Sequence, residues 1–475
     1  MSRVPILRAP LVGGSTVEWR LADPDRAEAE AVRTTEGLSF LQQDHVRACL
    51  EKRERGAPHT GTATSVTVFD GPLDRDAMAT ALTLFTRRHE ELRAMYPTDE
   101  HGPFRAVTPA EATRYVTVET DDTLTADEVI GYIVDRVGSK AVFDRMPGIV
   151  FGAVDEGDRF TFYAGCDHSH TDGFSQFMGA AEIARLYRAL RDGRETEEQP
   201  TGLFSDYIRA ESELARTVDP ADPRIATWRE ILSEHDRRVP PLPFDLGLAD
   251  GELAPAKPIR RILIDAEALT AIDARRAGGG TSMAGVLYAA LAAAQHELLG
   301  VDRFFTATVL STRTAETANM QGWLCNFAPV AFPIPPEATF GELAVSATSA
   351  VARARDLSGL PVHVVLALLA GEGAYIPEPG SPQMVSYIDF RRIPGSDDPV
   401  LQQLTGFQAI GETKNANTWF TRYPDHLTVT GHIPDNPTAR KSFDLYLDSV
   451  ERWISSYAEG DERKVRTSPS VQVGT

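Results

Sequence analysis

One segment of the chain combines residue types and spacing that suit proton transfer: Cys166-Asp167-His168-Ser169-His170-Thr171-Asp172-Gly173. Imidazole titrates near neutral pH, so His168 is a candidate base that takes a proton from a hydroxyl or an amine. Of the 11 histidines, only His168 has an acidic residue four positions later. We expect Asp172 to orient the turn or to pair with a distant arginine. We expect Gly173 to adopt a backbone conformation that other residues cannot.

The same histidines could also serve only to pack and to hydrogen-bond within a loop, and the motif alone leaves this reading open. We expect no metal site, because His168 and His170 lack a third ligand at suitable spacing. The three cysteines, Cys49, Cys166 and Cys325, fit neither a zinc site nor a disulfide framework. A cysteine nucleophile is not expected either, because the carboxylate of Asp167 disfavours a thiolate at Cys166.

Two predicted strands and a helix position the motif. Residues 149–154 and 160–166 are typical of paired strands joined by a short turn. Residues 174–190 carry an apolar stripe at helical spacing. The motif therefore falls at a strand-to-helix junction, where its side chains reach the edge of a sheet and are open to a substrate.

The chain as a whole predicts an α/β (α+β) protein of two similar halves. Proline and glycine are dense in residues 241–258, which we expect to link a first half, 1–240, to a second, 259–466. Residues 1–35 are expected to be irregular, and residues 467–475 to form a disordered tail. An interface between two such halves is a favoured place for a site.

Composition excludes two classes of function. The 475 residues carry a formal net charge of -20, so the chain lacks the excess of basic residues that nucleic-acid binding requires. The longest apolar run, 283–294, has twelve residues, whereas a membrane-spanning helix needs about 20. We therefore expect no transmembrane segment and a cytoplasmic protein, with at most peripheral contact with a membrane.

Further segments match a known family in its order along the chain. They are Leu38-Ser39-Phe40-Leu41-Gln42-Gln43, Arg88-His89-Glu90-Glu91-Leu92-Arg93, Phe204-Ser205-Asp206-Tyr207, Gly322-Trp323-Leu324-Cys325-Asn326-Phe327-Ala328-Pro329, Ser386-Tyr387-Ile388-Asp389-Phe390 and His432-Ile433-Pro434-Asp435-Asn436-Pro437. With residues 166–173, they resemble the condensation-domain superfamily of thioester-dependent acyltransferases, whose motif is His-His-x-x-x-Asp-Gly. The chain is most similar to the polyketide-associated branch, whose members esterify trehalose and related hydroxyl compounds.

The resemblance implies two chloramphenicol-acetyltransferase-like subdomains arranged in a V around a central tunnel. It implies that His168 is the catalytic histidine and that Asp172 is a structural residue paired with an arginine of the second half, best matched by Arg313. The first histidine of the family motif is replaced by Asp167 in this chain.

Three further residues are candidates for contact with substrate. Asn326 is a candidate to hold an oxyanion or the acyl carbonyl, with a structural turn as the alternative. Trp323 is a candidate to line an acyl or sugar pocket, with core packing as the alternative. Ser386, in one of the late matching segments, is a candidate substrate contact.

The resemblance further implies transfer of an acyl group from acyl-CoA or a carrier-bound phosphopantetheine to a hydroxyl of a sugar or of a polyketide or lipid alcohol. It implies no cofactor, and an acyl or peptidyl carrier protein or a polyketide synthase as a partner. A free-standing condensation enzyme of the nonribosomal-peptide type, acting on a carrier-bound aminoacyl group, is one alternative. An inactive relative that only binds is another.

Overall fold

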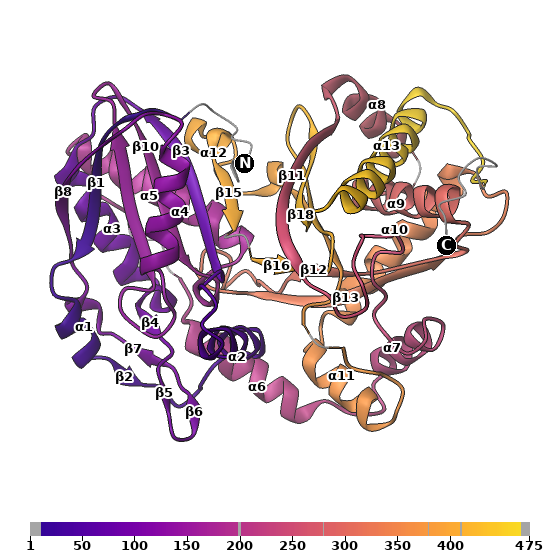
Figure 1. The fold of residues 1–475 in the computed structure, drawn as a ribbon, viewed down its shortest axis with the longest axis horizontal. Helices are drawn as coiled ribbons and strands as arrows, with labels where there is room; N and C mark the ends of the chain where they lie inside the picture. Colours follow the sequence, from indigo (N-terminus) through magenta and orange to yellow (C-terminus); the bar gives the residue numbers. More distant parts are fainter. Residues whose placement is uncertain (1–10, 198–200, 279, 379, 409–410, 467–475) are drawn as a thin grey trace.

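Two halves of mixed helix and sheet lie side by side, as the sequence predicts; the first is indigo to magenta and the second mostly orange to yellow (Figure 1). The computed structural model describes residues 11–197, 201–278, 280–378, 380–408 and 411–466. The tail predicted at 467–475 lies outside the described residues.

The first half is built on a six-stranded sheet with the order β15-β3-β10-β9-β1-β8. All neighbouring strands in it are antiparallel. The strands are β1 (Gly14–Leu21), β3 (Thr62–Asp70), β8 (Tyr115–Leu124), β9 (Ile149–Asp155), β10 (Arg159–Asp167) and β15 (Thr405–Gln408). Strand β10, which leads into the motif, is therefore hydrogen-bonded on both edges.

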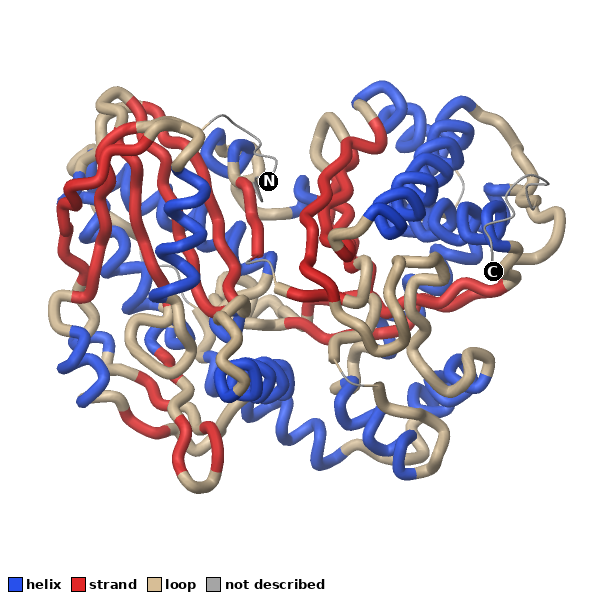
Figure 2. Tube along the Cα trace, in the orientation of Figure 1, coloured by secondary structure: helices blue, strands red, loops and turns tan. Residues whose placement is uncertain are grey.

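Helices cover both faces of this sheet. Helices α3 (Arg75–Arg88) and α5 (Gly173–Arg191) pack on one face, and α4 (Val129–Lys140) packs on the other (Figure 2). Successive side chains of a strand point to opposite faces, so Phe162 joins the core beneath α3 and α5 and Tyr163 joins the core beneath α4. Burial on both faces gives β10 a rigid setting.

The second half contains a seven-stranded sheet with the order β13-β12-β14-β17-β18-β11-β16. The strands are β11 (Ala254–Ile264), β12 (Arg303–Ser311), β13 (Cys325–Pro333), β14 (Met384–Asp389), β16 (Glu412–Thr413), β17 (Asn417–Arg422) and β18 (Leu427–Pro434). Its main helices are α8 (Ala266–Arg276), α9 (Met283–Leu299), α10 (Phe340–Leu357) and α13 (Pro437–Glu459). Helix α9 is apolar on nearly all sides because it lies in the centre of this core.

Shorter elements complete the described part of the chain. The helices are α1 (Pro24–Ala29), α2 (Phe40–Glu54), α6 (Phe204–Thr217), α7 (Pro223–Ser233), α11 (Val362–Gly371) and α12 (Pro399–Gln403). The short strands are β2 (Val32–Arg33), β4 (Ala94–Met95), β5 (Thr98–Asp99), β6 (Gly102–Pro103) and β7 (Ala106–Val107). Helix α2 begins at a capping box formed by Ser39 and Gln42.

The prediction that residues 1–35 are irregular is wrong. Within this range β1 lies between β8 and β9, inside the sheet. Its inward residues Val17 and Trp19 alternate with Glu18, which is also buried and is held by Arg136 and Lys140. Because the charged Glu18 interrupts the apolar pattern, the sequence does not reveal that this strand is buried on both faces.

The boundary predicted at residues 241–258 does not separate the halves cleanly. Strand β11 begins at Ala254 and includes Pro255 and Pro258; the partner strand opposite Pro255 is only the short β16. Strand β15, from the second half of the sequence, pairs with β3 and so completes the first sheet. The two halves are thus joined by an exchanged strand as well as by the linker.

Among the described residues, no single helix has the length and apolar composition of a membrane span. Helices α10 and α11 pass that test only when they are taken together across a bend of 89°.

The close approach of α4 to β10 predicts a measurable coupling. A Cβ atom at Gly165 would lie 2.4 Å from Cγ2 of Val137. We expect Gly165→Ala to destabilise the protein by about 1–3 kcal/mol through overpacking. In the double variant with Val137→Ala, the loss should be smaller than the sum of the single losses. Urea unfolding of the four proteins measures this, and strictly additive losses would contradict it.

Candidate active site

His168 stands on a short turn between β10 and α5. The strand ends at Asp167, a single 3-10 turn covers His168–His170, and α5 begins at Gly173. The backbone nitrogen of His168 donates to the carbonyl oxygen of Gly61 at 2.7 Å. The turn is therefore held by backbone bonds, and the imidazole of His168 is left free for chemistry.

The imidazole of His168 is half-buried and lies against an aromatic side chain. Its ring centroid is 4.2 Å from that of Trp323 and 6.1 Å from that of His45. Burial, with the positive charge of His45 added, lowers the pKa of His168 to about 4. Its Nδ1 is buried and has no hydrogen-bond partner among the described residues. His168 is thus neutral at neutral pH, as a proton acceptor must be.

Asp172 links the motif to the second half. Its Oδ1 accepts a hydrogen bond from the nitrogen of Ser175 at 2.7 Å and so caps α5. Its Oδ2 accepts one from Arg313 Nη1 at 2.7 Å and one from the nitrogen of Leu324 at 2.9 Å. Burial opposes ionisation, but Arg313 keeps the pKa of the Asp172 carboxyl below its usual range. The pairing of Asp172 with Arg313 that the resemblance implies is therefore present.

Arg313 is held on several sides at once. Its Nη2 donates to Ser175 Oγ at 2.6 Å, and its guanidinium lies over the ring of Phe174, 5.0 Å from the centroid. The side chain is nearly fully buried. A buried arginine with a carboxylate partner fixes the position of the segment after β12 relative to α5.

Gly173 does not have the role expected from the sequence. It is the first residue of α5, and it is not among the glycines with a positive φ. A Cβ there would meet only Cδ1 of Ile388, at 3.9 Å. Other residues could adopt this backbone, so what the glycine contributes is open space between the start of α5 and β14.

Trp323 and Ser386 come from two different segments of the second half. Trp323 follows the segment that Arg313 anchors and contacts the ring of His168. Ser386 is buried on β14, two positions before Ile388 and so on the same strand face. Because Ile388 lies nearest to Gly173, this face of β14 is turned toward the start of α5. Their role as substrate contacts stays a prediction.

Asn326 is committed to the backbone and is not available as an oxyanion donor. Its Nδ2 donates to the carbonyl oxygens of Ser358 at 2.8 Å and of Leu360 at 2.6 Å. Its Oδ1 accepts from the nitrogens of Phe327 and Val362. Both amide hydrogens are used, so the structural alternative describes this residue.

Asp167, which replaces the first histidine of the motif, is fully buried and bound from several sides. Its Oδ1 accepts from the nitrogen of Ser169 and from Nε2 of His45, both at 2.9 Å, and Nε2 of His59 lies 2.9 Å from its Oδ2. Burial favours neutral imidazole, but the Asp167 charge raises the pKa of His45 to about 10. His45 and His59 are not predicted from the sequence as neighbours of Asp167. The spacing of His45 and Cys49, four residues apart on one helix, is the available signal that two polar side chains share one helix face.

A thiol nucleophile is not supported at Cys166 or Cys325. Burial, with the charge of Asp167 added, raises the pKa of the Cys166 thiol far above its usual range. Burial and the charge of Asp172 raise the pKa of Cys325 as well. Both side chains are therefore protonated at neutral pH.

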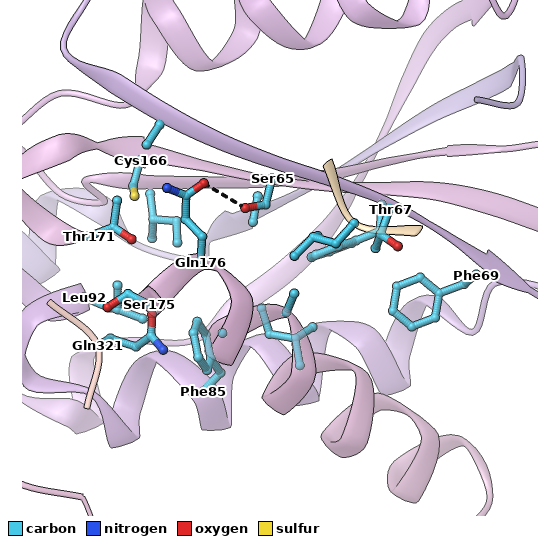
Figure 3. A pocket seen from close by; sticks show the side chains of 18 residues that line it. Ser65, Thr67, Phe69, Phe85, Leu92, Cys166, Thr171, Ser175, Gln176 and Gln321 are labelled. Atoms are coloured by element: carbon cyan, nitrogen blue, oxygen red, sulfur yellow. Dashed lines mark hydrogen bonds between the residues drawn. The ribbon is translucent and has the colours of Figure 1, made fainter. Parts of the chain in front are cut away.

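A pocket lies inside the first half, between β3, β10 and α5 (Figure 3). Cys166 and Thr171 lie at one end and Phe69 at the other, and Ser65 donates to Gln176 between them at 3.1 Å. His168 and Trp323 are not among the lining residues. The pocket thus begins beside the catalytic turn and extends into an apolar interior.

Comparisons with known proteins show the family of the chain. The model of the Condensation domain family matches residues 42–374. Acyltransferase PapA3 of Mycobacterium tuberculosis (strain ATCC 25618 / H37Rv) is 25% identical over 467 residues, which are 95% of both chains. The 2'-acyl-2-O-sulfo-trehalose (hydroxy)phthioceranyltransferase PapA1 of Mycobacterium bovis (strain BCG / Pasteur 1173P2) is 26% identical over 472 residues, covering 94% of this chain and 87% of the relative.

A solved structure, PapA2 acyl transferase, has the same fold, with a TM-score of 0.86 at 22% identity over 95% of this chain and 98% of that one. The two mixed helix-and-sheet subdomains are the fold of condensation domains. The chain belongs to the condensation-domain family. Relatives that match it over nearly its whole length are acyltransferases, and this chain is an acyltransferase too.

The Asp172–Arg313 pair predicts a large loss of stability when either partner is removed. We expect Asp172→Ala and Arg313→Ala each to cost about 3–5 kcal/mol, because each leaves a buried charge unpaired. The double variant should lose less than the sum. Urea unfolding measures this, with Arg26→Ala as the control, since its pair with Glu30 is exposed and contributes at most about 1 kcal/mol. A stable and fully active Asp172→Ala protein would show that the pair does not fix the site.

Proposed function

We propose that this acyltransferase moves an acyl group from a thioester to the hydroxyl of a sugar or of a polyketide or lipid alcohol, with His168 as the general base. The observation that carries the proposal is the neutral, half-exposed imidazole of His168 on a turn held by buried bonds. The acceptor class follows from PapA1, whose name describes transfer to an acylated sulfo-trehalose.

The reaction is a direct transfer. The acceptor oxygen attacks the thioester carbonyl carbon while His168 takes the hydroxyl proton, giving a tetrahedral intermediate. The carbon–sulfur bond then breaks, and the departing thiolate takes that proton from the imidazolium. General-base catalysis of this kind contributes about 10²–10⁴-fold, and the rest comes from holding two substrates together. No covalent acyl-enzyme is required, because a thioester is already activated.

The donor is a substrate and not a resident cofactor. Either acyl-CoA or a phosphopantetheine-linked acyl group on a carrier protein supplies the same thioester. Trp323, packed on His168, gives the reacting atoms an apolar wall on one side. Exclusion of water from that side disfavours hydrolysis of the thioester.

The acyl chain is placed in the pocket beside the turn of His168, whose volume of about 40 Å³ requires the lining side chains to move apart when a chain enters. The far end of the pocket is lined by Phe69 and its near end by Cys166 and Thr171, which flank His168 in the sequence, and Phe85 and Phe162 also line it. An apolar chain would bury its surface there at about 25 cal/mol per Å². The proposed donor is thus a thioester whose chain extends from the turn into the first half.

Free-thiol release from a panel of acyl-CoAs tests the reaction. We expect release that depends on trehalose or another alcohol, and a loss of about 10²–10⁴-fold in His168→Ala, because the variant lacks the base. His101→Ala is the matched control, since His101 is largely exposed on a distant turn and should leave the rate unchanged.

Other outcomes of the same assay distinguish the alternatives. Activity in His168→Ala equal to that of the wild type would overturn the role of His168. Release with amines but not alcohols would favour an amide-forming condensation enzyme. Release only from a loaded carrier protein would assign the donor to carriers, and no transfer from either donor would favour a protein that only binds.

The acyl pocket makes a prediction about chain length. Ala164 lines the pocket on β10, so Ala164→Leu should fill part of it. We expect kcat/KM for long-chain donors to fall by about tenfold or more while transfer of a short acyl group continues. Comparison of the two donors in one protein controls for damage to the fold. An equal loss for short and long chains would place the acyl chain elsewhere.

A further inference from the structure

Four donor side chains converge directly before the catalytic turn, and the proposed reaction uses none of them. They are His45, Cys49, His59 and Asp167. His45 and Cys49 are four residues apart on α2, so they lie on one face of that helix. The donor atoms of His45, Cys49 and Asp167 all lie within 4.8 Å of one another. Helix α2 and the end of β10 therefore meet at one point, and His59, on the loop after α2, lies beside it.

The contacts at this point are not those of a catalytic triad. Nε2 of His45 lies 2.9 Å from Asp167 Oδ1 and 3.6 Å from Cys49 Sγ. A triad needs both ring nitrogens, one toward the carboxylate and the other toward the nucleophile. Here the oxygen and the sulfur approach the same nitrogen. Donor atoms gathered around one point are instead the arrangement of a coordination shell.

His59 brings a fourth donor to the cluster. Its Nε2 lies 2.9 Å from Asp167 Oδ2, both atoms are buried, and their orientation is not that of a hydrogen bond. A buried polar atom left without a hydrogen bond costs about 1–3 kcal/mol. A cation between the imidazole nitrogen and the carboxylate oxygen would satisfy both atoms.

We propose that His45, Cys49, His59 and Asp167 bind a zinc ion. Two imidazoles, one thiolate and one carboxylate are ligands that Zn²⁺ takes in tetrahedral sites. Bond lengths of about 2.0–2.3 Å at the tetrahedral angle separate neighbouring donors by roughly 3.3–3.7 Å. The distance of 3.6 Å between Cys49 Sγ and His45 Nε2 already fits, and the contact of 2.9 Å between His45 Nε2 and Asp167 Oδ1 needs to open by a few tenths of an ångström. His59 approaches the other carboxylate oxygen, Oδ2, and lies outside the group of three donors within 4.8 Å, so its side chain must turn toward the ion.

The surroundings fix the positions of the ligands. The backbone at Gly61 packs directly on the cluster, since a Cβ there would lie 2.5 Å from Cε1 of His45. The His59 side chain is 19% exposed, which leaves a path for the ion.

The site is structural. All four positions are filled by protein donors, as in zinc sites that hold a fold together and do no chemistry. The ion would tie α2 and its following loop to Asp167, the residue before His168. The replacement of the motif's first histidine by Asp167 supplies one of the ligands.

Metal analysis of the full-length protein tests the proposal. We expect about one zinc per chain after purification without chelators, measured by inductively coupled plasma mass spectrometry. Exchange for Co²⁺ should give tetrahedral d–d bands and a thiolate-to-cobalt charge-transfer band. Metal added to the chelator-treated protein should raise its Tm, because the folded state alone presents the complete site.

Variants assign the ligands. Cys49→Ser should abolish the charge-transfer band, whereas Cys166→Ser should keep it. His59→Gln, on a partly exposed loop, should weaken metal binding by more than the ~10–100-fold that loss of an outer-shell partner costs, and His101→Gln should not. Wild-type protein that carries no more zinc than Cys49→Ser, or that binds Co²⁺ without the charge-transfer band, would overturn the proposal. These readouts do not depend on acyl transfer.

Discussion

The ion pair between Asp172 and Arg313 is the constraint on which the catalytic turn depends. The pair is buried and connects the two halves. The carboxylate of Asp172 also caps α5 and accepts a hydrogen bond from the backbone nitrogen of Leu324. One side chain therefore sets the start of the helix after His168 and the approach of Trp323 to the imidazole. The exchanged strand β15 and the linker join the halves elsewhere, whereas this pair joins them beside His168, together with the contacts of Leu324 and Trp323.

The turn carries a neutral base between two buried carboxylates. Asp167 is paired with His45 and His59, and Asp172 with Arg313, and the two carboxylates raise the pKa of His168 by less than burial and His45 lower it. Burial and the charge of His45 keep the pKa of His168 low. The lowered pKa makes the imidazole a weaker base but keeps it unprotonated at neutral pH. The proposed general base must be unprotonated to accept the proton as the acceptor hydroxyl attacks.

Sequence patterns over short ranges predicted those parts of the site whose residues are close together in the sequence. The strand-to-helix junction and His168 follow from alternation, helical spacing and the motif, and the family resemblance supplied Arg313. The neighbours of Asp167 could not be read in this way, because His45 is 122 residues away and meets it only through the packing of α2 on β10. The structural role of Asn326 could not be predicted either, because its hydrogen-bond partners are backbone groups 32 and 34 residues further along the chain. Strand β1 was missed because buried Glu18 depends on cations of α4.

Intact-protein mass spectrometry is the most direct test of acyl transfer from thioester to hydroxyl without a covalent acyl-enzyme. The wild-type protein is mixed with acyl-CoA, with and without an alcohol, and the protein mass and the ester product are followed together. Direct transfer predicts an unmodified protein in both samples and ester only where alcohol is present. A protein that gains the mass of the acyl group without alcohol, and loses it when alcohol is added, would contradict direct transfer and establish a covalent intermediate.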